Sequence, residues 1–79
     1  MRDYVAVQLR LPGRVTWRLY SVNGAGVRAC PLGDYRGIPG KSGLRMIRDS
    51  LQHGASSKAG KRTVQVSRQV RGQVNFRVS

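Results

Sequence analysis

The sequence predicts an α+β domain in which one short helix packs on one face of an antiparallel sheet of about five strands, in the order β-β-β-α-β-β. Two observations predict this fold. Valines and leucines alternate with polar residues in the segments expected to be strands, which is the pattern of half-buried sheets, whereas residues 42–54 place apolar side chains at helical spacing. With 79 residues the chain is expected to form a single small domain, 1–79.

The first expected hairpin joins YVAVQLRL (4–11) and VTWRLYSV (15–22). A three-residue loop at 12–14 would pair Leu11 with Val15, which keeps the odd-numbered apolar residues of both strands on one side of the sheet. The side chains assigned to this core face are Val5, Val7, Leu9, Leu11, Val15, Trp17 and Leu19.

A short third strand is expected around Val27 and Ala29. We expect a three- or five-residue loop before it, with Gly24 or Gly26 at a positive φ angle. Such a loop would place Val27 and Ala29 beside Leu19 and Trp17 of the preceding strand. The following segment, CPLGDYRGIPGKSG, contains two prolines and four glycines and is predicted to be a loop.

Residues 42–54, SGLRMIRDSLQHG, are predicted to form the helix. Ser42 is a candidate N-cap because its hydroxyl can accept a hydrogen bond from a free backbone N–H of the first turn. Leu44, Ile47 and Leu51 recur at helical spacing, so they form the stripe that would pack on the sheet.

The last part of the chain is predicted to form a flexible basic connector, 55–62, and then a second hairpin. A three-residue loop at 71–73 would keep the even-numbered apolar residues on one side and leave Arg68 opposite Phe76. Either a β-bulge re-aims Arg68, or its guanidinium stacks on the ring. The apolar residues of this hairpin are Val64, Val66, Val70, Val74, Phe76 and Val78.

Residues 4–51 resemble the YegP-like small domains of unknown function. The resemblance is carried by a tryptophan strand followed by Asn-Gly (TWRLYSVNG), a tyrosine loop (GDYRG) and a helix (SGLRMIRDSL). The chain departs from that family because it ends in a valine hairpin instead of continuing into a repeat of the same unit. The resemblance implies the fold and carries no function.

Charge is the feature that bears most directly on function. Fifteen lysines and arginines face three aspartates, which gives a formal net charge of +12, and twelve of the fifteen cations are arginines. The planar guanidinium of arginine binds phosphate or carboxylate oxygens in a bidentate manner. The sequence therefore favours a polyanionic partner, either nucleic acid or an acidic surface of a nucleoprotein complex. Codon bias in a GC-rich genome is the alternative origin of the arginines.

The outward face of the sheet is the first candidate binding surface. Arginines there would hold phosphates, tyrosine rings would stack on bases, and amides would read base edges. The alternative is an ordinary solvated sheet face. The residues expected on this face are Tyr4, Gln8, Arg10, Thr16, Arg18, Tyr20, Arg28, Gln65, Ser67, Gln73, Asn75 and Arg77.

Two further basic segments are candidates. Lys41, at the expected helix N-terminus, could contact a backbone phosphate, but the P-loop spacing is absent because Tyr35 stands where that motif needs a glycine. The connector and the tip of the last hairpin would form a basic arm, with a solvated linker as the alternative. The cations of this arm are Lys58, Lys61, Arg62, Arg68 and Arg71.

The protein is predicted not to be an enzyme, because no catalytic motif is present. His53 is the single histidine and is expected to interact with the helix dipole. A small ribonuclease toxin that uses His53 with Arg45 or Arg48 is the remaining catalytic alternative. Cys30 is alone, which excludes an internal disulfide and a multi-cysteine metal site and fits a cytoplasmic location. No cofactor or metal is expected, and no stretch is long enough to span a membrane.

The favoured function is therefore non-enzymatic binding to nucleic acid, DNA or RNA, or to a nucleic-acid-handling complex. The alternative is a phage- or mobile-element-encoded inhibitor of the anti-CRISPR type, which would bind an acidic protein surface and block access of nucleic acid. A homodimer could also form through an exposed edge strand at VNFRVS (74–79).

Overall fold

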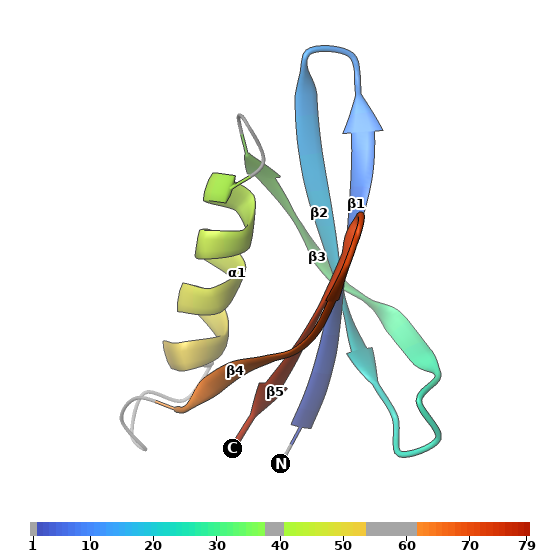
Figure 1. Ribbon diagram of the computed structural model, residues 1–79, viewed down its shortest axis with the longest axis vertical. Coiled ribbons are helices and arrows are strands. Elements are labelled where there is room, and N and C mark those ends of the chain that lie inside the picture. The colour runs from blue at the N-terminus through green and yellow to red at the C-terminus, as the bar shows by residue number, and fades with distance from the viewer. Residues whose placement is uncertain (1, 38–40, 54–61) are drawn as a thin grey trace.

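A computed structural model describes residues 2–37, 41–53 and 62–79. It confirms the predicted fold: one helix lies against one side of a single antiparallel sheet, as Figure 1 shows. The strand order is β3-β2-β1-β5-β4. The N-terminal strand is therefore in the middle of the sheet, paired with the C-terminal strand. The elements are β1 (Arg2–Leu11), β2 (Arg14–Val22), β3 (Arg28–Gly37), α1 (Lys41–His53), β4 (Val64–Val70) and β5 (Gln73–Val78).

The core lies between α1 and one face of the sheet. Ile47 and Leu51 of the helix are buried and Leu44 packs beside them, which confirms the predicted stripe. The helix begins at Lys41, so Ser42 lies inside the first turn and the prediction that it is the N-cap is wrong. The sheet residues buried in the same cluster are Tyr4, Ala6, Trp17, Leu19, Val74, Phe76 and Val78.

The first hairpin turns in two residues, so the predicted three-residue loop is wrong. Leu11 pairs with Arg14, and Gly13 has a φ of 74°. Proline followed by a glycine with positive φ is the combination of a type II turn, which closes the hairpin without a third residue. Tyr4 and Ala6 therefore point toward α1.

This change of register exchanges the two faces of β1, because adjacent strand residues point to opposite sides. The odd-numbered apolar side chains of β1 were expected in the core with Trp17 and Leu19, and they instead lie on the side of the sheet away from α1. We call this side the open face. The residues placed there by the shift are Val5, Val7, Leu9 and Leu11.

The β2–β3 connection is a five-residue loop, as predicted, with Gly26 at a φ of 78°. The Asn23 side chain accepts hydrogen bonds from the backbone N–H groups of Ala25 (2.9 Å) and Val27 (3.0 Å) and so fixes the loop. Val27 lies within this loop and Ala29 near the start of β3, so neither flanks Leu19 or Trp17, contrary to the prediction.

Residues 30–37 belong to β3, so the predicted loop is wrong over this segment. Trp17 pairs with Tyr35 and Leu19 with Gly33. Two register irregularities lie beside Tyr20, and Pro31 pairs there. A proline is tolerated because β3 is at the edge of the sheet, where a missing backbone N–H faces solvent.

The last hairpin also turns in two residues. Val70 pairs with Gln73, and Gly72 has a φ of 76°, so the predicted loop at 71–73 is one residue too long. A bulge between Val66 and Arg68 then places Arg68 opposite Asn75, which confirms the bulge alternative. Within this hairpin the edge strand is β4, whereas β5, which contains most of VNFRVS, lies inside the sheet, so the edge was assigned to the wrong strand. The predicted connector lies outside the described residues except for Arg62.

Candidate nucleic-acid interface

The open face carries arginines from four of the five strands. Strand alternation and the pairing register place Arg14 and Arg18 of β2 on this face. On β3, Arg36 pairs with Thr16 and Arg28 with Val22, so these two arginines lie on the same face. Arg68 joins them through the bulge in β4, and Arg77 through its pairing with Asp3. The complete set of open-face arginines is Arg14, Arg18, Arg28, Arg36, Arg68 and Arg77.

Two aspartates share the open face, and each is paired. Arg18 Nε donates to Asp34 Oδ1 at 2.9 Å and Arg18 Nη2 to Asp34 Oδ2 at 3.2 Å, a bidentate arrangement. Arg77 Nε donates to Asp3 Oδ1 at 3.0 Å. Both pairs are half-exposed, so they contribute little to stability. Their consequence for binding is that two of the six arginines are already neutralised.

The Arg18–Asp34 ion pair predicts a lowered pKa for the Asp34 carboxyl group, which can be checked by titration. The hydrogen bonds from Arg18 hold the pKa of Asp34 below its ordinary value of 3.8, and the nearby Arg36 acts in the same direction. The stabilising contribution is therefore complete above that ordinary value and disappears as the pH falls through the lowered pKa. NMR titration of the Asp34 carboxyl carbon is expected to show this lowered pKa, and Arg18→Gln is expected to move it back up. A titration that is identical in the variant would contradict the pairing.

Arg28 lies across the open face. Its guanidinium is 5.5 Å from the centroid of the Tyr20 ring, and its Nη2 donates to Gln73 Oε1 at 3.4 Å. Gln73 belongs to β5, which is separated from β3 by two strands, so the two strands would be about 14 Å apart in a flat sheet. The bond therefore reflects a strongly twisted and curled sheet, whose crossing strands are visible in Figure 1.

An apolar stripe runs along β1 in the middle of the open face. Val5, paired with Tyr20 and Asn75, is only 2% exposed although it points away from the helix. Val7 and Leu9 are half-buried, and Leu11 is exposed at the end of the strand. The arginines of β2 and β3 thus lie on one side of this apolar stripe. The amide groups of Gln73 and Asn75 lie on its other side, where β4 and β5 also carry Arg68 and Arg77.

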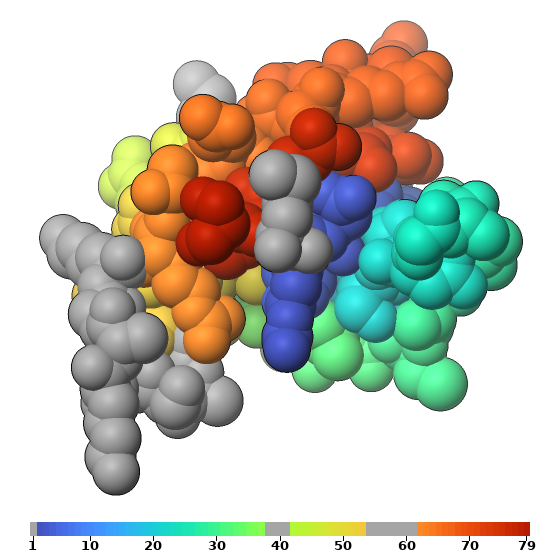
Figure 2. All heavy atoms as spheres, turned by 90° about the horizontal axis from the view of Figure 1, so that it is seen from below, coloured from blue at the N-terminus to red at the C-terminus, as the bar shows by residue number. Residues whose placement is uncertain are grey.

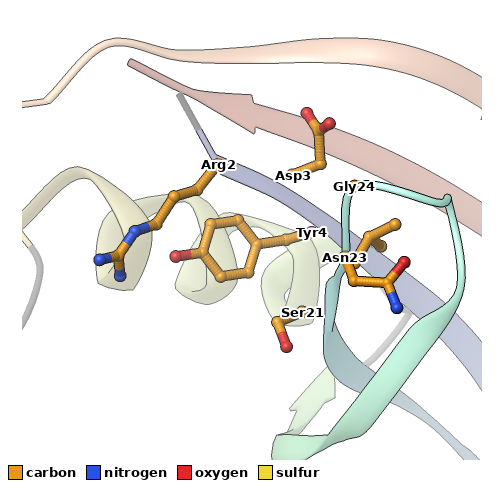
Figure 3. Close-up of a pocket in the computed structure, with 7 residues that line it drawn as sticks. Arg2, Asp3, Tyr4, Ser21, Asn23 and Gly24 are labelled. Atoms are coloured by element: carbon orange, nitrogen blue, oxygen red, sulfur yellow. The ribbon is translucent and has the colours of Figure 1, made fainter.

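The helix side of the molecule carries the residues that were wrongly assigned to the binding face on β1. Tyr4 is buried in the core, so its ring cannot serve as a stacking platform, and Gln8 and Arg10 point to this side as well. Figure 3 shows Arg2 and Tyr4 directed toward α1 and Asp3 directed away from it. The physical reason is the two-residue turn, which sets the even-numbered residues of β1 against the helix.

Positive charge is present on both sides of the sheet. The described helix-side cations are Arg2, Arg10, Arg45, Arg48 and Arg62, with Asp49 as the acid. The open face has six arginines and two aspartates, so among the side chains that the structure describes each side has an excess of four positive charges. Figure 2 shows the N-terminal end of β1 between β5 and the end of β2, with β4 on the far side of β5. Net charge therefore does not distinguish the two sides as a binding face, whereas the arrangement of the charged groups does.

The structure brings together Arg18, Tyr20, Arg28, Arg68 and Arg77 of the predicted site residues. Arg71 is in the turn at the tip of the last hairpin, and Arg62 lies near the start of β1 beside Arg2. Lys58 and Lys61 lie outside the described residues, as does the side chain of Lys41.

Two arginines of the open face were missed from the sequence. Arg14 alternates with Thr16 and Arg18 and could have been found by extending the period of β2 by one residue. Arg36 lies in the segment that was predicted to be a loop, so no strand period could be applied to it.

His53 is exposed at the end of α1, in a groove that also contains Asp49, Arg2 and Arg62. No cluster of three or more histidine, cysteine or aspartate side chains that could hold a metal ion occurs in residues 2–37, 41–53 and 62–79. Within the same residues, α1 lacks the length and the apolar character needed to cross a membrane.

The described residues define a two-layer α+β domain with an arginine-bearing open sheet face. No family model matches the chain, and searches of curated proteins and of solved structures found no significant match. The resemblance to YegP-like domains thus stays a prediction from the sequence.

Proposed function

We propose that this protein is a non-enzymatic binding protein whose open face docks on the phosphate backbone of nucleic acid. One observation carries the proposal. Of the six open-face arginines, Arg14, Arg28, Arg36 and Arg68 have no carboxylate partner among the described residues, which include all three aspartates of the chain. Unpaired guanidinium groups on one face repel one another, and phosphates relieve this repulsion while accepting bidentate hydrogen bonds.

The contact expected is with the backbone more than with the bases. Tyr20 is the single aromatic residue on the described open face, and Arg28 already lies over its ring. Base stacking would therefore require Arg28 to move, whereas Arg14, Arg36 and Arg68 can bind phosphates as they stand. Binding of this kind is insensitive to sequence and weakens steeply with salt.

A second candidate is supported by the apolar stripe. Val7, Leu9 and Leu11 form an apolar centre with a charged rim, which is the usual anatomy of a protein interface. On this reading the arginines bind carboxylates of an acidic protein surface, and the protein acts as an inhibitor of a nucleic-acid-handling complex, for instance of the anti-CRISPR type. Either partner fits a cytoplasmic setting, in which the exposed thiol of Cys30 stays reduced.

The test compares two triple variants with the same net charge. Arg14→Gln/Arg36→Gln/Arg68→Gln removes unpaired open-face arginines, and Arg10→Gln/Arg45→Gln/Arg48→Gln removes three from the helix side. Fluorescence anisotropy with labelled single-stranded DNA, RNA and duplex DNA is measured between about 50 and 200 mM salt. On duplex DNA, each phosphate contact contributes about 0.9 to the steepness of the plot of log affinity against log salt concentration. The slope of the open-face variant is therefore expected to become shallower by up to about 2.7, whereas that of the helix-side variant changes little.

The reciprocal arm adds a charge to each side in turn. Asp34→Asn frees Arg18 on the open face, whereas Asp49→Asn gives the same net charge on the helix side, so only the former is expected to tighten binding. Equal losses for the two triple variants would contradict docking through the open face. If the wild type binds no nucleic acid at low salt but retains a protein from a nuclease-treated lysate, the inhibitor replaces the first proposal.

A further inference from the structure

A cleft lies between α1 and the strands β4 and β5, on the side of the sheet opposite the proposed nucleic-acid face. Its volume is about 210 Å³. Leu44, Val66, Val74 and Phe76 form its apolar walls, and Val66 remains 41% exposed. This volume is below the roughly 300 Å³ at which small-molecule sites begin, so it suits one or two side chains of a docked segment.

The cleft borders a free sheet edge. Strand β4 is the last strand of the sheet, and all its residues except Val64 are exposed. The backbone N–H of Ser79 donates to the carbonyl of Thr63 at 3.1 Å, so Thr63 directs its backbone toward β5. Because backbone groups alternate along an antiparallel strand, Val64 and Val66 direct their N–H and C=O groups to the unpaired side.

Among the described residues, the opposite edge is disrupted along part of its length, whereas the single bulge of β4 lies beyond Val66. Strand β3 carries Pro31, which has no N–H, and two register irregularities that disrupt a regular ladder. An added strand therefore finds regular backbone partners at Val64 and Val66, and its side chains alternate between the cleft and the open side.

The charges around the cleft select the partner. Arg45 and Arg48 of α1 line the cleft, and Arg68 lies on the open face of β4. No acid lines the cleft, since Asp49 lies in the groove on the other side of α1. A second copy of this chain would bring its own arginines against these, so like-charge repulsion disfavours self-pairing at β4.

We infer that the β4 edge and its cleft bind an extended acidic peptide segment of another protein by strand addition. The segment places apolar side chains in the cleft and carboxylates beside Arg45, Arg48 and Arg68. This surface shares Arg68 with the proposed nucleic-acid face, but its cleft, its backbone partners and Arg45 and Arg48 lie apart from the contact at Arg14 and Arg36.

The probe is a capped peptide as long as β4, Asp-Thr-Val-Glu-Leu-Thr-Glu. Its valine and leucine face the cleft, its terminal acids reach Arg45 and Arg48, and its central glutamate faces Arg68. Titration into ¹⁵N-labelled protein is expected to shift the amide signals of Val64 and Val66. Arg45→Gln/Arg48→Gln is expected to weaken binding roughly three- to tenfold, as two partly exposed charge pairs would, while Arg10→Gln/Arg14→Gln, with the same net charge, has little effect.

Two control peptides separate strand addition from charge attraction alone. N-methylation of the peptide amides that face β4 is expected to abolish the shifts of Val64 and Val66. Replacing the acidic residues of the peptide by Asn and Gln is expected to make these shifts smaller. Equal binding of the N-methylated peptide, or shifts confined to Arg14 and Arg36, would overturn the inference. So would concentration-dependent dimers in sedimentation with protected Val64 and Val66 amides, which would assign the edge to a second copy. Nucleic-acid affinity of Arg45→Gln/Arg48→Gln is measured in parallel, so failure of either proposal is recognised independently.

Discussion

Ile47→Ala is expected to lower the free energy of unfolding by about 2–5 kcal/mol. Ile47 is fully buried where the middle of α1 meets the sheet, and its truncation leaves a cavity that the neighbouring Trp17 and Leu51 cannot fill without moving. For a domain whose total stability is about 5–15 kcal/mol, this loss is a large share. Urea unfolding followed by far-UV circular dichroism measures it.

Met46→Ala is the matched control for this variant. Met46 precedes Ile47 on the same helix and is 44% exposed, so its truncation is expected to change stability by no more than about 0.5 kcal/mol. Equal losses for the two variants would mean that the helix does not pack on the sheet through Ile47.

Gly43→Ala is expected to destabilise the protein, although helix propensity alone predicts a gain of about 1 kcal/mol. A Cβ at this position would lie 2.8 Å from Trp17 Cδ1 and 2.9 Å from the backbone carbonyl oxygen of Tyr35. Neither neighbour is the flexible end of a side chain, so α1 must move away from β2 and β3. Overpacking of this kind costs about 1–3 kcal/mol, which exceeds the gain from propensity.

The control is Gly24→Ala in the β2–β3 loop, where a Cβ would meet nothing within 4 Å. Its stability is expected to be unchanged or slightly raised, because alanine restricts the unfolded chain. The sign of the Gly43→Ala effect, measured by thermal unfolding, decides between the two arguments. Stabilisation would show that propensity dominates and that the helix has room to approach the sheet.

The helix and the element order could be predicted from the sequence because each rests on a local pattern. Leu44, Ile47 and Leu51 have a helical period that no strand accommodates, and the bulge at Arg68 follows from the cost of setting an arginine against Phe76. On β5 the even-numbered residues Val74, Phe76 and Val78 are inside as expected.

The faces of β1 could not be predicted in the same way, because alternation identifies the core only when the other face of a strand is solvated. β1 is central, and on its open side Val5, between the paired Tyr20 and Asn75, is as well buried as Ala6 on its core side. Which face of β1 enters the core then depends on whether the β1–β2 turn has two or three residues. The sequence Pro12-Gly13 permits both, and an error of one residue moves Tyr4 and Arg10 to the wrong side.

The candidate site was predicted in part for the same reason. Arg18 and Tyr20 could be found because the period of β2 was assigned correctly, and Arg77 because that of β5 was. Arg28 could be found because a five-residue loop before β3 was among the predicted lengths. Arg36 was missed because glycines and prolines around β3 indicated a loop, whereas the edge position and the two irregularities beside Tyr20 let Pro31 pair within a strand. Strand order is a long-range property and leaves no local signal.

The pairing of β1 with β5 has a consequence for how the chain must fold. Each hairpin brings together residues that are close in sequence, whereas the β1–β5 ladder joins Arg2 to Val78 and has the largest loop-closure entropy of any pairing in the sheet. The centre of the molecule is thus its most non-local part, which raises the contact order and slows folding relative to a simple meander of the same length. The open face and the β4 edge both depend on the β1–β5 pairing, since it places Arg68 and Arg77 on the same face as the arginines of β2 and puts β4 at the edge of the sheet.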